Sequence, residues 1–148
     1  MKINILSNEI MELIKEMLNK GRAVDLTVSG ESMRPFYYNQ KTVVTLTAPK
    51  HPFKKYDVVL YYDKNKYKLH RIIGFRKGLL VICGDALKEK EYIVTSAVLG
   101  QVIKHQTGDV IVDARSRRYI FKVFLWYMLF PLRRYLLRLF KGRSKDES

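Results

Sequence analysis

The pattern of apolar and polar residues changes along the chain from a helical period to a strand period. Near the N-terminus, apolar side chains recur every three or four positions while charged residues occupy the other faces, as in a one-sided surface helix. The apolar positions are Ile10, Leu13, Ile14, Met17 and Leu18. Gly21 follows them, and glycine commonly ends helices. We interpret this helix as structural.

From Ala23 onward the apolar residues alternate with polar ones. Val24, Leu26 and Val28 take every second position, which predicts a strand. Further runs of this kind, separated by turn residues, lie at 42–47, 57–62, 67–75, 79–83, 98–104 and 110–113. Several short strands after one helix predict a mostly β domain of the α+β class, with a small coiled or barrel-like sheet.

The last quarter of the chain has a different composition. The segment Ile120–Leu132 follows a basic cluster at 115–118 and contains Lys122 as its only charged residue. Its uninterrupted apolar part, Val123–Leu132, would be about 15 Å long as a helix, roughly half the thickness of a bilayer's hydrocarbon core. We therefore predict two parts, a folded domain over 1–114 and a basic, hydrophobic C-terminal helix over 115–148.

Charge is concentrated in that second part. Residues 115–148 carry 10 basic and 2 acidic side chains, so they contribute +8 of the net charge of +14. Such a segment attracts phosphate, and its basic residues alternate with bulky aliphatic ones, which favours an anionic membrane surface over nucleic acid. Trp126 and Tyr127 would suit the headgroup boundary of an interfacial anchor.

Two other interpretations of the C-terminal helix stay open. It can pack on its own domain with its basic residues outward, or it can span the membrane with Lys122 and Arg133 reaching the two interfaces. The heavier basic cluster lies after the apolar run, which favours a cytosolic C-terminus. We expect a protein that is peripheral on the cytosolic side of a membrane, with a spanning anchor as the alternative.

One segment has the features of a nucleophile turn. Gly30-Glu31-Ser32-Met33-Arg34-Pro35 directly follows the first predicted strand. An attacking serine needs exposure, a fixed orientation and nearby backbone N–H groups, and a turn between glycine and proline can supply all three. The alternative is an ordinary turn serine, because serine, glycine and proline are common in turns.

This turn and four later stretches resemble the signal peptidase I family of serine peptidases. The chain is similar to that family's G-x-S-M-x-P box at 30–35 and to its later boxes, in the same order, at 55–60, 69–74, 83–85 and 98–102. Bacterial members usually have a lysine as general base, whereas this chain has His70 at that position. It therefore looks like the endoplasmic-reticulum and archaeal branch.

The resemblance implies roles for four residues. Ser32 would be the nucleophile, His70 the general base, and Asp85 the acid that orients His70, while Met33 would shape the substrate site. Glu91 is a second candidate for the orienting acid. No metal or organic cofactor is implied. Cys83 is the only cysteine, so an internal disulfide and a C-x-x-C metal site are excluded.

The resulting hypothesis is a serine endopeptidase that cleaves signal or leader peptides at or near a membrane. Its partners would be a peptide or protein with such a segment and an anionic membrane surface, and no nucleic acid is expected. Two alternatives are a non-catalytic membrane-binding module on the same fold and a repressor-like self-cleaving peptidase domain. A catalytic pair requires Ser32 Oγ within hydrogen-bond reach of His70, and a separation above about 6 Å would favour the binding module.

Overall fold

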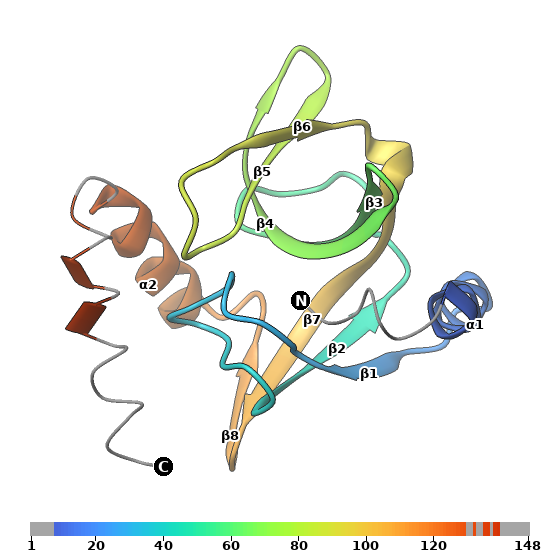
Figure 1. Cartoon of the computed structure of the whole chain (residues 1–148), viewed down its shortest axis with the longest axis horizontal. Coiled ribbons are helices and arrows are strands. Elements are labelled where there is room, and N and C mark those ends of the chain that lie inside the picture. The colour runs from blue at the N-terminus through green and yellow to red at the C-terminus, as the bar shows by residue number, and fades with distance from the viewer. Residues whose placement is uncertain (1–7, 130–131, 133–134, 137, 140–148) are drawn as a thin grey trace.

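Two helices flank a curved, antiparallel sheet of eight strands (Figure 1). The computed structural model describes residues 8–129, 132, 135–136 and 138–139. In chain order the elements are α1 (Asn8–Asn19), β1 (Val24–Thr27), β2 (Thr42–Thr47), β3 (Val58–Asp63), β4 (Lys66–Arg76), β5 (Leu79–Cys83), β6 (Glu91–Ile93), the 3₁₀ turn η2 (Thr95–Ala97), β7 (Val98–Thr107), β8 (Val110–Asp113) and α2 (Arg117–Met128). The predicted mostly β fold of the α+β class is confirmed.

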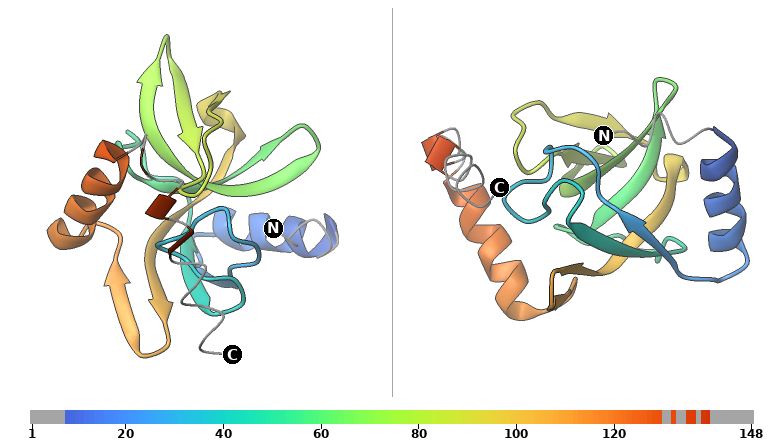
Figure 2. Two further views of the ribbon diagram at one scale, coloured as in Figure 1. Left: turned by 60° about the vertical axis from the view of Figure 1, so that its left-hand side comes forward. Right: turned by 60° about the horizontal axis from the view of Figure 1, so that its bottom comes forward.

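The sheet coils because its two longest strands, β4 and β7, pair with different strands along their length. Its order is β1-β2-β7-β3-β4-β5-β6, and β8 pairs with the last part of β7, on the edge opposite β2. Register shifts interrupt the β2–β7, β3–β7 and β4–β5 pairings. Shifts of this kind bend a strand and increase its twist. The two further views show the strands curling round between α1 and α2, which lie on opposite sides of the domain (Figure 2).

Strand β3 is buried on both faces and separates two hydrophobic cores. Val58 and Leu60 point into the core that contains α1, whereas Val59 and Tyr61 point into the other. Successive side chains of a strand point to opposite faces, so Tyr61 shares its face with Val59. That geometry directs a tyrosine hydroxyl into the region of the candidate site described below.

Helix α2 is packed on the domain. The side chain of Ser116 caps its N-terminus by accepting a hydrogen bond from the Tyr119 backbone N–H. The side chains of Tyr119, Val123 and Trp126 are buried, and their spacing of four and three places them on one face.

This packing corrects the expected position of Trp126 and Tyr127 at a headgroup boundary. Trp126 is only 6% exposed and donates a hydrogen bond to the carbonyl of Asp85. At Arg117–Met128 the structure has the alternative in which the helix packs on its own domain. No described helix combines the length and the apolar character that crossing a membrane requires. Most of the predicted segment after Leu129, including Arg133, lies outside the described residues.

Candidate active site

The turn after β1 holds Ser32 at the surface of the domain. Gly30 has φ of 97°, a conformation in which side chains are strained, and its N–H donates to Asn39 Oδ1 at 2.8 Å. Arg34 N–H closes the turn by donating to the Glu31 carbonyl at 3.2 Å. Ser32 itself is half-buried, so its hydroxyl is held by a defined loop and still reaches solvent.

His70 on β4 lies against this serine. His70 Nε2 is 3.2 Å from Ser32 Oγ, within hydrogen-bond distance. The imidazole is buried, with 8% of the residue exposed. The structure thus brings together two of the predicted site residues, which come from segments 38 positions apart in the sequence.

Behind His70 lies a chain of polar groups that connects it to Glu91. The Tyr61 hydroxyl is 3.0 Å from His70 Nδ1 and donates to Glu91 Oε2 at 3.0 Å. Lys68 Nζ donates to the other carboxylate oxygen of Glu91 at 2.9 Å. Tyr61 and Lys68 are cross-strand neighbours on β3 and β4, and His70 shares their face because it is two residues from Lys68.

Burial and hydrogen bonding set the charges in this chain. Burial lowers the pKa of His70 to about 4, although the nearby Glu91 charge opposes that shift. Partial burial works against ionisation of Glu91, but the hydrogen bonds from Lys68 and Tyr61 outweigh it and lower the pKa of Glu91. Burial, together with the Glu91 charge, raises the pKa of Tyr61. At neutral pH the site therefore contains a neutral imidazole, a carboxylate and a protonated phenol.

These charge states determine which ring nitrogen of His70 carries the proton. A carboxylate only accepts hydrogen bonds, so the single Tyr61 proton is directed to Glu91. The Tyr61 oxygen can then accept only from a protonated Nδ1 of His70. In a neutral imidazole with Nδ1 protonated, Nε2 has a free lone pair. That lone pair faces Ser32 Oγ, which is the arrangement that a general base requires.

Asp85, which was expected to orient His70, takes a different position. Its carboxylate accepts from Arg71 Nε at 2.9 Å and from Arg71 Nη2 at 2.8 Å, and it also accepts from the Tyr127 hydroxyl. The side chains of Arg71 and Asp85 are both fully buried. The contact to His70 Nδ1 comes from Tyr61 instead. Of the two candidate acids, Glu91 is the one connected to His70 through that contact.

The Asp85 loop nevertheless supports the turn that carries Ser32. Ala86 N–H donates to the Ser32 carbonyl at 2.9 Å. A Cβ at Gly84 would lie 2.8 Å from the same carbonyl oxygen, which is too close for any other residue without a shift of the backbone. The Gly84-Asp85 pair therefore combines a close backbone approach to Ser32 with an ion pair that holds the loop.

Met33 and Cys83, which the sequence singled out, and the two histidines other than His70 lie in core or surface environments. Met33 was expected to contact substrate, but it is 2% exposed and belongs to the core that contains α1. Cys83 is buried at the end of β5. His105 is buried against Tyr37, with ring centroids 4.9 Å apart, and burial lowers its pKa to about 4. His51 is exposed beside Phe53.

Sequence reasoning missed Tyr61 and Lys68 as site residues. The signal for Lys68 was available, because it is two positions from His70 on the same predicted strand. Tyr61 lies on the neighbouring strand, and its place depends on the β3–β4 register. Among the described residues, no group of three His, Cys, Asp or Glu side chains is arranged to hold a metal ion.

Comparisons with known proteins do not extend the resemblance seen in the motifs. No model of a known protein family matches the chain, and no curated protein matches it.

Because Asp85 forms a buried ion pair with Arg71, we predict that it stabilises the folded state. Asp85→Asn would leave the Arg71 charge buried without a counter-charge, which should lower the free energy of unfolding by about 3–5 kcal/mol. Urea denaturation followed by circular dichroism measures this change. Asp109→Asn is a matched control at an exposed position and should stay within about 0.5 kcal/mol of the parent. Equal urea midpoints for all three proteins would contradict the role given to Asp85.

Proposed function

We propose that this protein is a serine endopeptidase in which Ser32 and His70 form the catalytic pair. The observation that carries the proposal is the 3.2 Å contact between Ser32 Oγ and His70 Nε2, with Tyr61 and Glu91 behind the imidazole. This contact favours a peptidase over a non-catalytic module on the same fold. The motif resemblance to the signal peptidase I family supports the same reaction type.

The proposed reaction needs only groups present at the site. Ser32 Oγ attacks the carbonyl carbon of the scissile bond while its proton passes to His70 Nε2. The carbon–nitrogen bond then breaks, and the imidazolium gives that proton to the leaving amine. Water then attacks the acyl-enzyme and gives a proton to His70 Nε2. As the bond between the acyl carbon and Ser32 Oγ breaks, His70 returns that proton to Ser32 Oγ. Glu91, acting through the Tyr61 hydroxyl, stabilises the imidazolium that forms twice in each cycle.

The developing oxyanion needs hydrogen-bond donors near Ser32. The Ser32 backbone N–H makes no hydrogen bond within the part of the chain that the structure describes. It lies on the residue that attacks, so it is the first candidate for this role. The bond from Ala86 to the Ser32 carbonyl holds that peptide in place.

The substrate class we propose is a signal or leader peptide bound in an extended conformation near a membrane. Strand β1 is at the edge of the described sheet and leads directly into the Ser32 turn. An extended peptide can add to such an edge through main-chain hydrogen bonds, which would place a scissile bond beside Ser32. The basic C-terminal region supports a peripheral location on the cytosolic side of an anionic membrane.

The reaction can be tested without a known substrate. The purified protein and its Ser32→Ala variant are each incubated with a diverse peptide pool in the presence of lipid vesicles, and new peptide termini are identified by mass spectrometry. We expect cuts made by the parent and absent with the variant, whose fold should be unchanged because the hydroxyl is at the surface. Identical sets of termini would contradict the proposal, as would equal cleavage by both proteins.

The pKa of His70 predicts the pH dependence of cleavage. Because only the neutral imidazole accepts a proton, kcat/KM for a peptide found in the pool should stay high as the pH falls through 6.5. It should drop near the lowered His70 pKa of about 4. Stopped assays across pH 3.5–8 measure this profile. A drop centred near pH 6.5 would contradict the buried, neutral state of His70.

The same assay tests the position of Tyr61. Tyr61→Phe removes the hydroxyl that fixes the imidazole, so kcat should fall on the order of 10²-fold. Tyr62→Phe is the matched control, because Tyr62 is exposed and its hydroxyl bonds Asn65 away from the site. Equal rates for the two variants would show that the tyrosine behind His70 does not act in catalysis.

A further inference from the structure

Helix α2 has a second face that is apolar and open to solvent. Its exposed side chains are Phe121, Phe124, Leu125 and Met128, at positions i, i+3, i+4 and i+7 of the helix. Phe121 is 59% and Met128 65% exposed, and the rings of Phe121 and Phe124 stack with centroids 6.4 Å apart. A stripe of large apolar side chains outside the core marks a contact surface.

Positive charge lies beside the first part of this stripe. The exposed residues Arg117, Arg118 and Lys122 lie on the helix itself. An open depression of about 770 Å³ runs between α2 and the segment before β3, and cations and aromatic rings share its lining. Its charged residues are Lys54, Lys55, Arg115 and Arg117. Arg115 also pairs with Asp57 at 3.2 Å, while the lining contains no acidic side chain.

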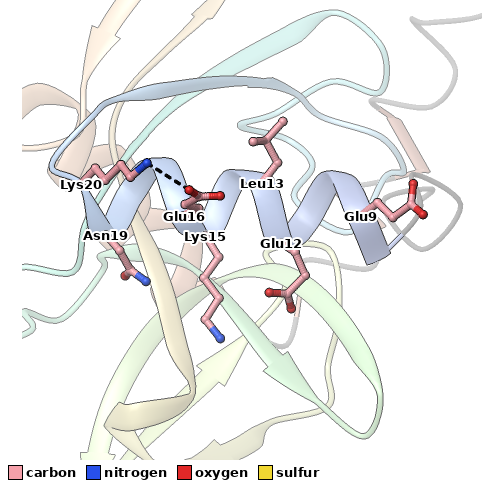
Figure 3. A pocket seen from close by; sticks show the side chains of 7 residues that line it. All are labelled: Glu9, Glu12, Leu13, Lys15, Glu16, Asn19 and Lys20. Carbon is pink, nitrogen blue, oxygen red and sulfur yellow. Dashed lines mark hydrogen bonds and ion pairs between the residues drawn. The ribbon is translucent and has the colours of Figure 1, made fainter.

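Helix α1 offers an internal comparison, because it also carries a surface depression (Figure 3). Three glutamates and two lysines line it, together with Leu13 and Asn19. Lys20 and Glu16 form an ion pair there at 3.0 Å. Charges of both signs give that face no preference for anions. Among these two depressions, only the one beside α2 combines aromatic side chains with charge of a single sign.

We propose that the outer face of α2, together with Lys54 and Lys55, is a docking surface for an anionic phospholipid bilayer. The cations would contact lipid phosphate, and Phe121 and Phe124 would enter the boundary between headgroups and acyl chains. An apolar face flanked by lysine and arginine is typical of helices that lie in the interface of an anionic membrane. The residues at the membrane are thus different from Trp126 and Tyr127, which face the domain.

The two faces of α2 connect this surface to the nucleophile turn. The inner face donates hydrogen bonds from Trp126 and Tyr127 to Asp85, and the neighbouring Ala86 holds the Ser32 carbonyl. A docked helix would therefore keep Ser32 at a fixed distance from the lipid surface. This last consequence rests on the proposed peptidase function, whereas the docking itself does not.

Vesicle binding by the full-length chain carrying Ser32→Ala tests the docking independently of catalysis. Co-sedimentation is measured with vesicles of phosphatidylglycerol and phosphatidylcholine at about 3:7 and with phosphatidylcholine alone. We expect binding to the anionic vesicles only, weakened by salt. The pair Lys54→Gln and Lys55→Gln should weaken binding about 30-fold, since each lysine near an anionic surface contributes about 1 kcal/mol.

Matched variants make the site assignment falsifiable. Lys66→Gln with Lys77→Gln removes the same charge from exposed positions on other hairpins, and it should change binding no more than about twofold. Phe121→Ala with Phe124→Ala keeps the charge and should weaken binding about tenfold or more. Thermal unfolding by circular dichroism confirms that each variant is folded.

Several outcomes would overturn the docking proposal. These are no binding to anionic vesicles, equal binding to both compositions, equal loss with the two lysine pairs, or full binding by the phenylalanine variant. A lipid-free dimer that the phenylalanine substitutions abolish would assign the face to a second copy of the chain. If docking holds and the peptide-pool experiment shows no cleavage, the peptidase proposal fails alone.

Discussion

The buried ion pair between Arg71 and Asp85 is the interaction on which the arrangement of the site depends. Taking both charges out of water costs several kcal/mol each, and only good geometry and further hydrogen bonds offset that cost. Here two parallel bonds join the side chains. Arg71 also donates to the Tyr56 carbonyl and the Tyr119 hydroxyl. The pair thereby ties β4, the loop after β5 and helix α2 into one unit.

The two faces of strand β4 carry neighbouring residues with different partners. His70 faces Ser32 and the polar chain that ends at Glu91, while the next residue, Arg71, points the other way to Asp85. The loop that carries Asp85 then returns to the Ser32 carbonyl. A single strand thus positions His70, the proposed general base, directly and Ser32, the proposed nucleophile, indirectly. We infer that this coupling keeps the two groups in hydrogen-bond reach without any contact from substrate.

Local sequence patterns predicted most of the fold, and long-range packing decided the rest. The alternation at Val24–Thr27 and Thr42–Thr47 identified strands correctly. Strand β6 was missed because three residues among charged neighbours show no periodicity, and that strand carries Glu91. The motif around Ser32 predicted a candidate nucleophile, and the structure places that serine beside His70. The groups behind His70 depend on strand register. Trp126 was assigned to a lipid boundary because composition does not reveal which face of a helix meets the domain.

The most direct test of the central claim is the protonation of the His70 ring. Nitrogen-15 NMR of protein labelled at its three histidines, with His70→Gln to assign the signals, reports both ring nitrogens. We expect a neutral ring at pH 7 with the proton on Nδ1 and a free Nε2, and this state should persist until the pH approaches about 4. An imidazolium at pH 7, or a proton on Nε2 instead, would leave Ser32 without a base and contradict the account.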